Sequence, residues 1–191
     1  VRTAGGKRYG KLSGWHSADL AAEVLKALVE RNNLDPALVE DLYWGCAEPS
    51  GKHGSNIARG IAVLAGLDHL QAATVNRFCA AGITAVSIAA DRIRVGEAEV
   101  MLAGGVESMS MVPMGGSKPS FNPKVVDLDE NVGIAYGMGM TAEKVAEQWK
   151  VTREEQDAFA TESHRRAIAA QQAGFFDAET TPIEIEVRTP N

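Results

Sequence analysis

The segment TVNRFCAAGITAVSIAADRIRVG, residues 74–96, decides the fold because it joins a strand pattern directly to a helix pattern. It begins with the β-branched pair Thr74 and Val75 and continues as a long apolar stretch that ends in charged residues. Cys79 stands at the junction, and Gly82 follows shortly after it. Position alone leaves two interpretations of this cysteine. It is either a small core residue or a nucleophile held where a strand turns into a helix.

The residues after Cys79 are predicted to form a helix that is apolar on nearly all sides. The apolar side chains lie on one stripe and beside it: Ile83, Val86, Ala90 and Ile93 on the stripe, and Ala85, Ile88 and Ala89 off it. A helix of this kind is expected to be buried. Its N-terminus directs unpaired N–H groups and the positive end of its dipole toward Cys79, which favours the attacking thiolate. The same N–H groups suit the oxyanion that develops during acyl transfer.

Strand and helix patterns alternate through the first part of the chain. Helices are predicted at three places: from Ser17 as an N-cap, from Asp35 and Pro36 as cap and first helical residue, and over 55–67. The first helix has an apolar face made of Leu20, Val24, Ala27 and Leu28. Strands are predicted over 41–48, 73–78 and 99–105, the last being a continuous apolar run typical of a strand buried on both faces. This alternation predicts an α/β layered fold.

The composition changes after Glu107, where residues 108–140 show little periodicity and contain much Gly, Pro and Met. Two further helices are predicted: 141–149 with Thr141 as its cap, and 152–174 with a Thr152–Glu155 capping box and Gly174 at its stop. We therefore expect an α/β domain over 1–109, with its first strand missing, and an incomplete loop subdomain over 110–191. The run IEIEV, residues 183–187, alternates like the start of a half-buried strand.

Composition excludes several classes of protein. The 191 residues carry 19 basic and 25 acidic side chains, a net charge of −6, which argues against a nucleic-acid-binding or anionic-membrane-binding surface. No apolar run reaches the roughly 18 residues of a membrane span. The chain has two cysteines, Cys46 and Cys79, and so no disulfide framework, which favours a reducing compartment, the cytoplasm. No zinc spacing, P-loop or dinucleotide fingerprint is present, so neither a metal nor a nicotinamide cofactor is expected.

Three motifs together resemble the N-terminal half of a thiolase: VNRFCAAG (75–82), MLAGGVESMS (101–110) and MGMTAEKVAEQWKVTREEQDAFATESHRRA (138–167). They cover nearly the whole chain in order. The run VPMGG (112–116) is similar to bacterial degradative 3-ketoacyl-CoA thiolases. The resemblance implies a layered αβαβα fold built from two similar halves, with a loop domain inserted after the GGVES strand of the first half. This chain resembles the first half plus part of that loop domain. The second half, with its catalytic histidine, asparagine and second cysteine, is absent.

The resemblance also implies roles for individual residues. Cys79 accepts the acyl group, with its backbone N–H in an oxyanion hole, and Met138 touches the acyl-thioester end of the substrate. Asn76 and Arg77 position the nucleophile turn against a partner subunit, and Glu107 is a structural carboxylate near the dimer interface. The family takes acyl-CoA and coenzyme A as substrates, binds no permanent cofactor, and forms homodimers or dimers of dimers.

The four histidines of the chain and its other cysteine match no family motif: His16, His53, His69, His164 and Cys46. His164 is expected to be a solvated helix residue and Cys46 a core residue. Two positions depart from the family. Gly137 stands where many thiolases have a histidine, and alanines replace a serine-containing turn after Cys79. Neither change removes the thiol.

The implied activity is thiolytic cleavage of 3-ketoacyl-CoA, or the reverse Claisen condensation, within fatty acid metabolism. The 1–191 chain alone is expected to be inactive because its partner groups are missing. Two alternatives compete: a decarboxylating or HMG-type condensing relative, which the motifs over 138–160 disfavour, and a non-catalytic acyl-CoA-binding protein. Five of the six methionines lie between Met109 and Met140. They either cover an acyl or pantetheine chain or fill a core.

Overall fold

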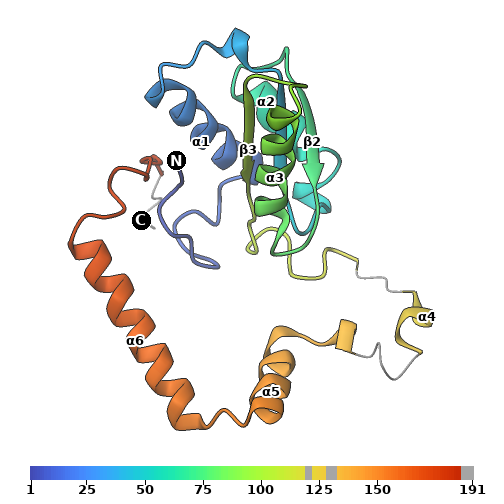
Figure 1. Ribbon diagram of the computed structural model, residues 1–191, viewed down its shortest axis with the longest axis vertical. Helices are drawn as coiled ribbons and strands as arrows, with labels where there is room; N and C mark the ends of the chain where they lie inside the picture. Colours follow the sequence, from blue (N-terminus) through green and yellow to red (C-terminus); the bar gives the residue numbers. More distant parts are fainter. Residues whose placement is uncertain (119–121, 128–132, 186–191) are drawn as a thin grey trace, which may run out of the picture. The chain divides into compact units, whose positions relative to one another are not determined.

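The computed structural model describes residues 1–118, 122–127 and 133–185, which belong to two compact units. One unit comprises Val1–Lys118 together with the chain from Glu179 onward, and the other comprises Pro119–Ala178 (Figure 1). The sequence predicted a single boundary between residues 109 and 110.

The loop after residue 107 belongs to the first unit because it is held there by buried and hydrogen-bonded groups. Val112 is buried, the Gly115 N–H donates to Glu48 Oε1 over 2.7 Å, and the Ser117 N–H donates to Ser50 Oγ over 3.4 Å. The chain also returns to this unit after Ala178. Arg2 pairs in parallel with Thr180 through backbone hydrogen bonds at both ends of the bridge, each of 2.8 Å.

The first unit is built on a parallel sheet of three strands, which confirms the predicted α/β class. The strands are β1 (Asp41–Gly45), β2 (Gln71–Val75) and β3 (Met101–Gly105), in the order β2-β1-β3. Gly45 lies opposite both Val75 and Gly105, so all three strands end at the same level. The carboxyl edge of the sheet therefore collects the residues that follow each strand.

Helices cover both faces of this sheet (Figure 1). α1 (Ser17–Arg31) and α2 (Ile57–Leu64) pack against each other and against the face that carries Leu42 and Trp44, and they enclose the main apolar core. α3 (Ala81–Arg94) packs on β1 and β3, toward Tyr43 and Gly45. Successive residues of a strand point to opposite faces of the sheet. Leu42 and Trp44 therefore face α1 and α2, whereas Tyr43 and Gly45 face α3. Two short 3₁₀ helices, η1 (Pro36–Leu38) and η2 (Gly51–His53), lie in the connections.

α1 starts as predicted but is capped and buried differently. The N-cap is His16, whose Nδ1 accepts the Ala18 N–H over 3.2 Å, so Ser17 is the first helical residue and not the cap. The buried positions are Ser17, Ala18, Leu20, Ala21, Ala22 and Leu25. Of the predicted apolar face only Leu20 is fully buried, because the small alanines let this side of the helix approach the core closely.

The prediction that α3 is buried on all sides is wrong for the described structure. Its buried residues are Ala81, Ala85 and Ala89, whereas Ile83 is 71 % exposed and Val86 is 52 % exposed. The alanines carry almost no side chain, so this face fits closest to the sheet and the large apolar residues face outward. β3 is likewise only half-buried and not buried on both faces, with Leu102 alone fully enclosed.

α3 is fixed to β1 at both of its ends. At the N-terminal end, a Cβ atom added to Gly45 would lie 2.6 Å from the Ala81 carbonyl carbon, so only glycine permits this approach. At the C-terminal end, Arg92 Nη1 lies 2.5 Å from Asp41 Oδ2 in a half-buried ion pair and 3.3 Å from the Tyr43 hydroxyl. The first turn of α3 is therefore placed by direct contact with the sheet.

The second unit contains three α-helices within its described residues: α4 (Pro123–Val126), α5 (Met138–Trp149) and α6 (Arg153–Gln172). α5 begins earlier than predicted, with Gly137 as its N-cap, and Thr141 instead donates to the Gly137 carbonyl within the first turn. α6 has the predicted Thr152–Glu155 capping box, and Gly174 follows it with φ +73°. His164 is exposed on α6, as predicted.

The strand predicted over 183–187 is not present in its described part, since residues 183–185 adopt no regular structure and 186–187 lie outside the described residues. Across the described ranges, none of the helices has the length and apolar character needed to cross a bilayer.

Candidate functional site

The turn from β2 into α3 carries Cys79 at the carboxyl edge of the sheet. Asn76 starts the turn, and its Oδ1 accepts the Phe78 N–H over 2.9 Å. The Arg77 carbonyl accepts the Ala80 N–H over 3.0 Å, which closes the chain into a tight bend. Phe78 has φ +48°, a left-handed conformation that costs a non-glycine residue energy and is held here by these hydrogen bonds. The bend delivers Cys79 to the start of α3.

Cys79 is exposed, which rules out the core interpretation within the described chain. It directly precedes Ala80, the N-cap of α3, and Ala80 supplies no side-chain hydrogen bond to the first turn. The N–H groups at a helix start have no partner inside the helix and carry the positive end of its dipole. The predicted junction of strand, cysteine and helix is thus confirmed, and the thiol lies at an uncapped helix start.

Cys46 lies in a different environment from the exposed Cys79. It is fully buried in the core, as predicted. Burial, with a further contribution from the Glu107 carboxylate, raises the pKa of the Cys46 thiol to about 12. Cys46 Sγ lies 3.7 Å from Glu107 Oε1, so the protonated thiol donates a weak hydrogen bond. Because the thiolate is the reactive form, Cys46 is the inert cysteine of the pair.

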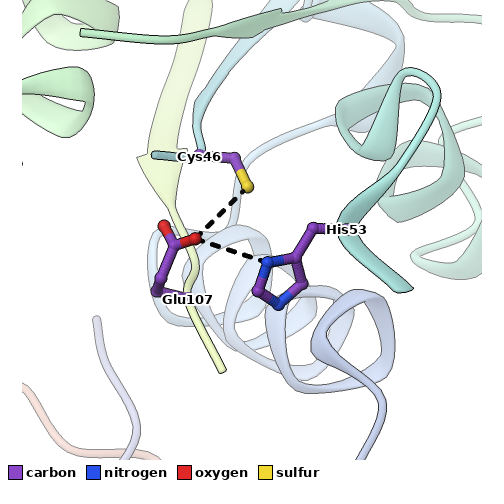
Figure 2. A group of neighbouring side chains, drawn as sticks. All are labelled: Cys46, His53 and Glu107. Atoms are coloured by element: carbon purple, nitrogen blue, oxygen red, sulfur yellow. Dashed lines mark hydrogen bonds and ion pairs between the residues drawn. The ribbon is translucent and has the colours of Figure 1, made fainter. Parts of the chain in front are cut away.

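Glu107 follows β3 and lies at the centre of a polar cluster beside Cys46 (Figure 2). Its Oε2 accepts the Ala47 N–H over 2.8 Å, and its Oε1 accepts the Glu48 N–H over 3.1 Å. Burial raises the pKa of Glu107, but the hydrogen bond from His53 and those two backbone N–H groups outweigh it, so the pKa is lowered overall. Glu107 is an ionised carboxylate that ties the end of β3 to the segment after β1.

His53 completes this cluster and was not predicted to take part in any site. Its side chain is fully buried in η2, with Nδ1 3.3 Å from Glu107 Oε1 and 3.2 Å from the Glu48 carbonyl oxygen. The Ser108 N–H approaches Nε2 at 3.2 Å. A backbone N–H can only donate, so Nε2 is the acceptor and the neutral ring carries its proton on Nδ1. That proton points at Glu107 and the Glu48 carbonyl.

Cys46, His53 and Glu107 offer one ligand atom each, all within 4.8 Å of one another, which is the spacing of a candidate metal site. The hydrogen bonds fit a metal poorly. A metal at Nδ1 would move the ring proton to Nε2, where it would face the Ser108 N–H, so that two donors would oppose each other. The three side chains are better described as a hydrogen-bonded cluster.

The remaining predicted site residues are distributed between the two units. Asn76 and Arg77 shape the Cys79 bend through the contacts described above. Met138 is the first residue of α5 in the other unit and is 60 % exposed. Of the methionines between 109 and 140, four are exposed in the described structure: Met109, Met114, Met138 and Met140. Exposure of these side chains disfavours the core-filling interpretation.

The sequence model of one protein family, described as "Thiolase, N-terminal domain", matches residues 1–191. The chain belongs to the thiolase family. A 3-ketoacyl-CoA thiolase of Erwinia tasmaniensis is 43 % identical over 187 residues, which cover 96 % of this chain and 47 % of that protein. A beta-ketoadipyl-CoA thiolase of Acinetobacter baylyi is 40 % identical over 204 residues, covering 98 % of this chain and 51 % of that protein. The matching protein of Pseudomonas aeruginosa, also a beta-ketoadipyl-CoA thiolase, is 41 % identical.

The chain spans about half the length of the thiolases it matches. The thiolase resemblance inferred from the three motifs is thereby confirmed, together with the assignment to the N-terminal part of the family. Within this part, the bend at Cys79 and the Glu107 cluster both lie at the carboxyl edge of the sheet. The α/β prediction locates that edge, whereas the inclusion of His53 follows only from the fold.

Proposed function

We propose that the protein containing this chain is an acyltransferase that cleaves 3-ketoacyl-CoA with coenzyme A, or runs the reverse Claisen condensation with acetyl-CoA. The observation that carries the proposal is the exposed Cys79 thiol at the uncapped start of α3, in a domain that belongs to the thiolase family. Relatives are named 3-ketoacyl-CoA thiolase and beta-ketoadipyl-CoA thiolase, which supports this class of substrate.

The chemistry proceeds in two halves through an acyl-Cys79 intermediate. The Cys79 thiolate attacks the 3-keto carbon, the bond between C2 and C3 breaks, and acetyl-CoA leaves after its α-carbon takes up a proton. A base then takes the proton from the thiol of coenzyme A, and the resulting sulfur attacks acyl-Cys79. This step releases the shortened acyl-CoA and regenerates the Cys79 thiolate. Such a covalent route gives ping-pong kinetics in both directions. By resemblance, the base and proton donor come from the second half of thiolases.

The groups around Cys79 have supporting roles in this proposal. The backbone N–H of Cys79 would hold the oxyanion that forms on the attacked carbonyl, with the positive end of the α3 dipole beside it. Asn76 fixes the bend, and Glu107 fixes the neighbouring strand ends. Met138 and the other exposed methionines would cover the acyl or pantetheine chain, because their flexible thioethers adapt to irregular apolar surfaces. Coenzyme A and acyl-CoA act as substrates, with no permanently bound cofactor.

We also propose a homodimer, or a dimer of such dimers, formed through β2 and the bend that follows it. β2 is an edge strand of the described sheet, and Phe78 in the bend is 68 % exposed. An unpaired edge beside an exposed aromatic residue is suited to an isologous contact. Light scattering that found a stable, active monomer of the full-length protein would refute this assembly. The cytoplasm is the proposed location, since an exposed thiol nucleophile must stay reduced.

The acyl-Cys79 intermediate can be tested by trapping it in the full-length protein. Acetoacetyl-CoA or acetyl-CoA should leave an acetyl group on the Cys79 peptide and none on the Cys46 peptide, as measured by mass spectrometry after acid quenching. Cys79→Ser should abolish turnover, because a hydroxyl is a far weaker nucleophile than a thiolate, whereas the control Cys46→Ser should keep its active-site chemistry. An acyl label on Cys46 would overturn the assignment. Tight binding of acetyl-CoA without any covalent label would favour a non-catalytic acyl-CoA-binding protein instead.

A further inference from the structure

His53 is a buried polar side chain that the proposed chemistry does not use, yet it lies at the same sheet edge as Cys79. Its neutral ring directs the Nδ1 proton at the Glu48 carbonyl and the Glu107 carboxylate and accepts the Ser108 N–H at Nε2. A buried donor of this kind is stable only while its partners are in place. The ring therefore has three contacts: Nδ1 faces the Glu107 carboxylate and the Glu48 carbonyl oxygen, and Nε2 accepts the N–H of the loop that begins at Ser108.

Hydrogen bonds and short stretches of backbone connect Glu107 to the Cys79 bend. Glu107 accepts the N–H groups of Ala47 and Glu48 over 2.8 and 3.1 Å. The adjoining Cys46 N–H donates to the Val75 carbonyl at the end of β2 over 3.0 Å. Val75 is followed at once by Asn76, whose side chain holds the Phe78 N–H. A shift of the segment after β1 would therefore move Val75 and, with it, Asn76 at the start of the bend.

A second route runs through the backbone of β1 itself. Gly45 at the end of β1 touches the first turn of α3, and its carbonyl accepts the Val106 N–H over 3.0 Å. Val106 directly precedes Glu107. Glu107 is therefore connected to the start of α3 by two routes. One passes through Val106 and Gly45, and the other passes through Cys46 and Val75.

We propose that His53 is a positioning residue for Cys79, acting by holding the Glu107 carboxylate against the segment after β1. The His53 Nδ1–H lies against both the Glu107 carboxylate and the Glu48 carbonyl, and so ties Glu107 to the segment after β1. Glu107 in turn accepts the N–H groups of Ala47 and Glu48, and that backbone leads to both the bend and the first turn of α3. The lowered pKa of Glu107, to which His53 contributes, agrees with this arrangement. The link to catalysis rests on the function proposed above, whereas the link to the geometry and reactivity of the thiol does not.

The test compares three variants of His53 in the full-length protein. His53→Leu fills a similar volume but removes all three contacts. His53→Asn keeps a side-chain N–H near the position of Nδ1 and so retains the donor toward Glu107, whereas His53→Gln places its amide farther out, toward Ser108. His69→Leu is the matched control. The His69 ring donates to the Pro36 carbonyl over 3.1 Å, and it precedes β2 at the opposite edge of the sheet.

The primary readout is the second-order rate of alkylation of Cys79 by iodoacetamide, followed on its peptide by mass spectrometry. We expect His53→Leu to lower this rate by about tenfold, since a thiol displaced from the helix start loses the favourable dipole that promotes its attacking form. His53→Asn should restore most of the rate, while His53→Gln should remain slow and His69→Leu should match the unmodified protein. With acetoacetyl-CoA, His53→Leu should lower kcat and leave KM nearly unchanged.

The inference is overturned if the Cys79 alkylation rate of His53→Leu stays within twofold of the control, or if His53→Gln restores it better than His53→Asn. Should His53→Leu fail to fold, the comparison of the Asn and Gln variants decides by itself. If the unmodified protein shows no thiolytic activity, the proposed function fails, but the alkylation rates still test the role of His53.

Discussion

Gly45→Ala should displace the start of α3 and with it Cys79. The added Cβ would lie 2.6 Å from the Ala81 carbonyl carbon and from the Gly82 nitrogen, whereas ordinary contacts begin at 3.4 Å. Both neighbours are backbone atoms of the first helical turn, so no side-chain rotation can relieve the clash. The turn would have to move by about 0.8 Å relative to β1, an overpacking that typically costs about 1–3 kcal/mol. A displacement of this size can also slow a reaction by up to about 100-fold.

The control for this change is Gly60→Ala. Gly60 lies in α2, is exposed, and has no atom within 4 Å of an added Cβ. Since alanine is the better helix former, this variant should gain about 0.5–1 kcal/mol of stability. Both variants would be made in the full-length protein and compared by urea unfolding and by the alkylation rate of Cys79. If Gly45→Ala matches Gly60→Ala in both measurements, the contact between β1 and α3 does not place the cysteine.

Two further changes test other parts of the site. The pKa of Cys46 is raised to about 12 when folded, so above pH 9 only the unfolded thiol ionises and the free energy of unfolding falls as pH rises. From pH 8 to pH 10, Cys46→Ala should therefore lose about 1.4 kcal/mol less stability than the unmodified protein; equal losses would contradict the shift. Gly137 is the N-cap of α5 with open space around an added Cβ, so Gly137→His should alter KM for the CoA thioester and leave kcat nearly unchanged. A fall in kcat at constant KM would show that this residue does not contact the pantetheine chain of the CoA thioester.

Local periodicity was enough to predict the order of strands and helices and the position of Cys79 between them. It failed for α3, where the pattern showed apolar residues all round but could not show which face meets the sheet. That choice depends on Gly45, a residue of a different strand, whose missing side chain admits the alanine face. Helix starts were also misplaced where the cap was unusual, at His16 and at Gly137.

The cluster around Glu107 lay beyond the reach of sequence patterns for a different reason. Cys46, His53 and Glu107 come from three separate segments. Cys46 follows β1 and Glu107 follows β3, and only the parallel register of these two strands brings the strand ends together beside His53. His53 lies in a Gly-rich turn that has no periodicity, so nothing in the sequence distinguishes it from a solvated histidine. A polar residue in such a turn becomes informative only when the neighbouring loop is seen to bury it.

The bridge between Arg2 and Thr180 sets an order of events during folding. Its partners are separated by nearly the whole chain, so on a ribosome it can form only after the residues that follow α6 have emerged. The sheet, α1, α2 and α3 depend on contacts within the first 118 residues and can assemble while the second unit is still being synthesised. Closing so long a loop has an entropic cost. When the loop closes late, the first unit is already compact, so the two partners have fewer conformations to sample before they meet. The N-terminal segment therefore waits longest for its partner, although it is the first part of the described chain to be made.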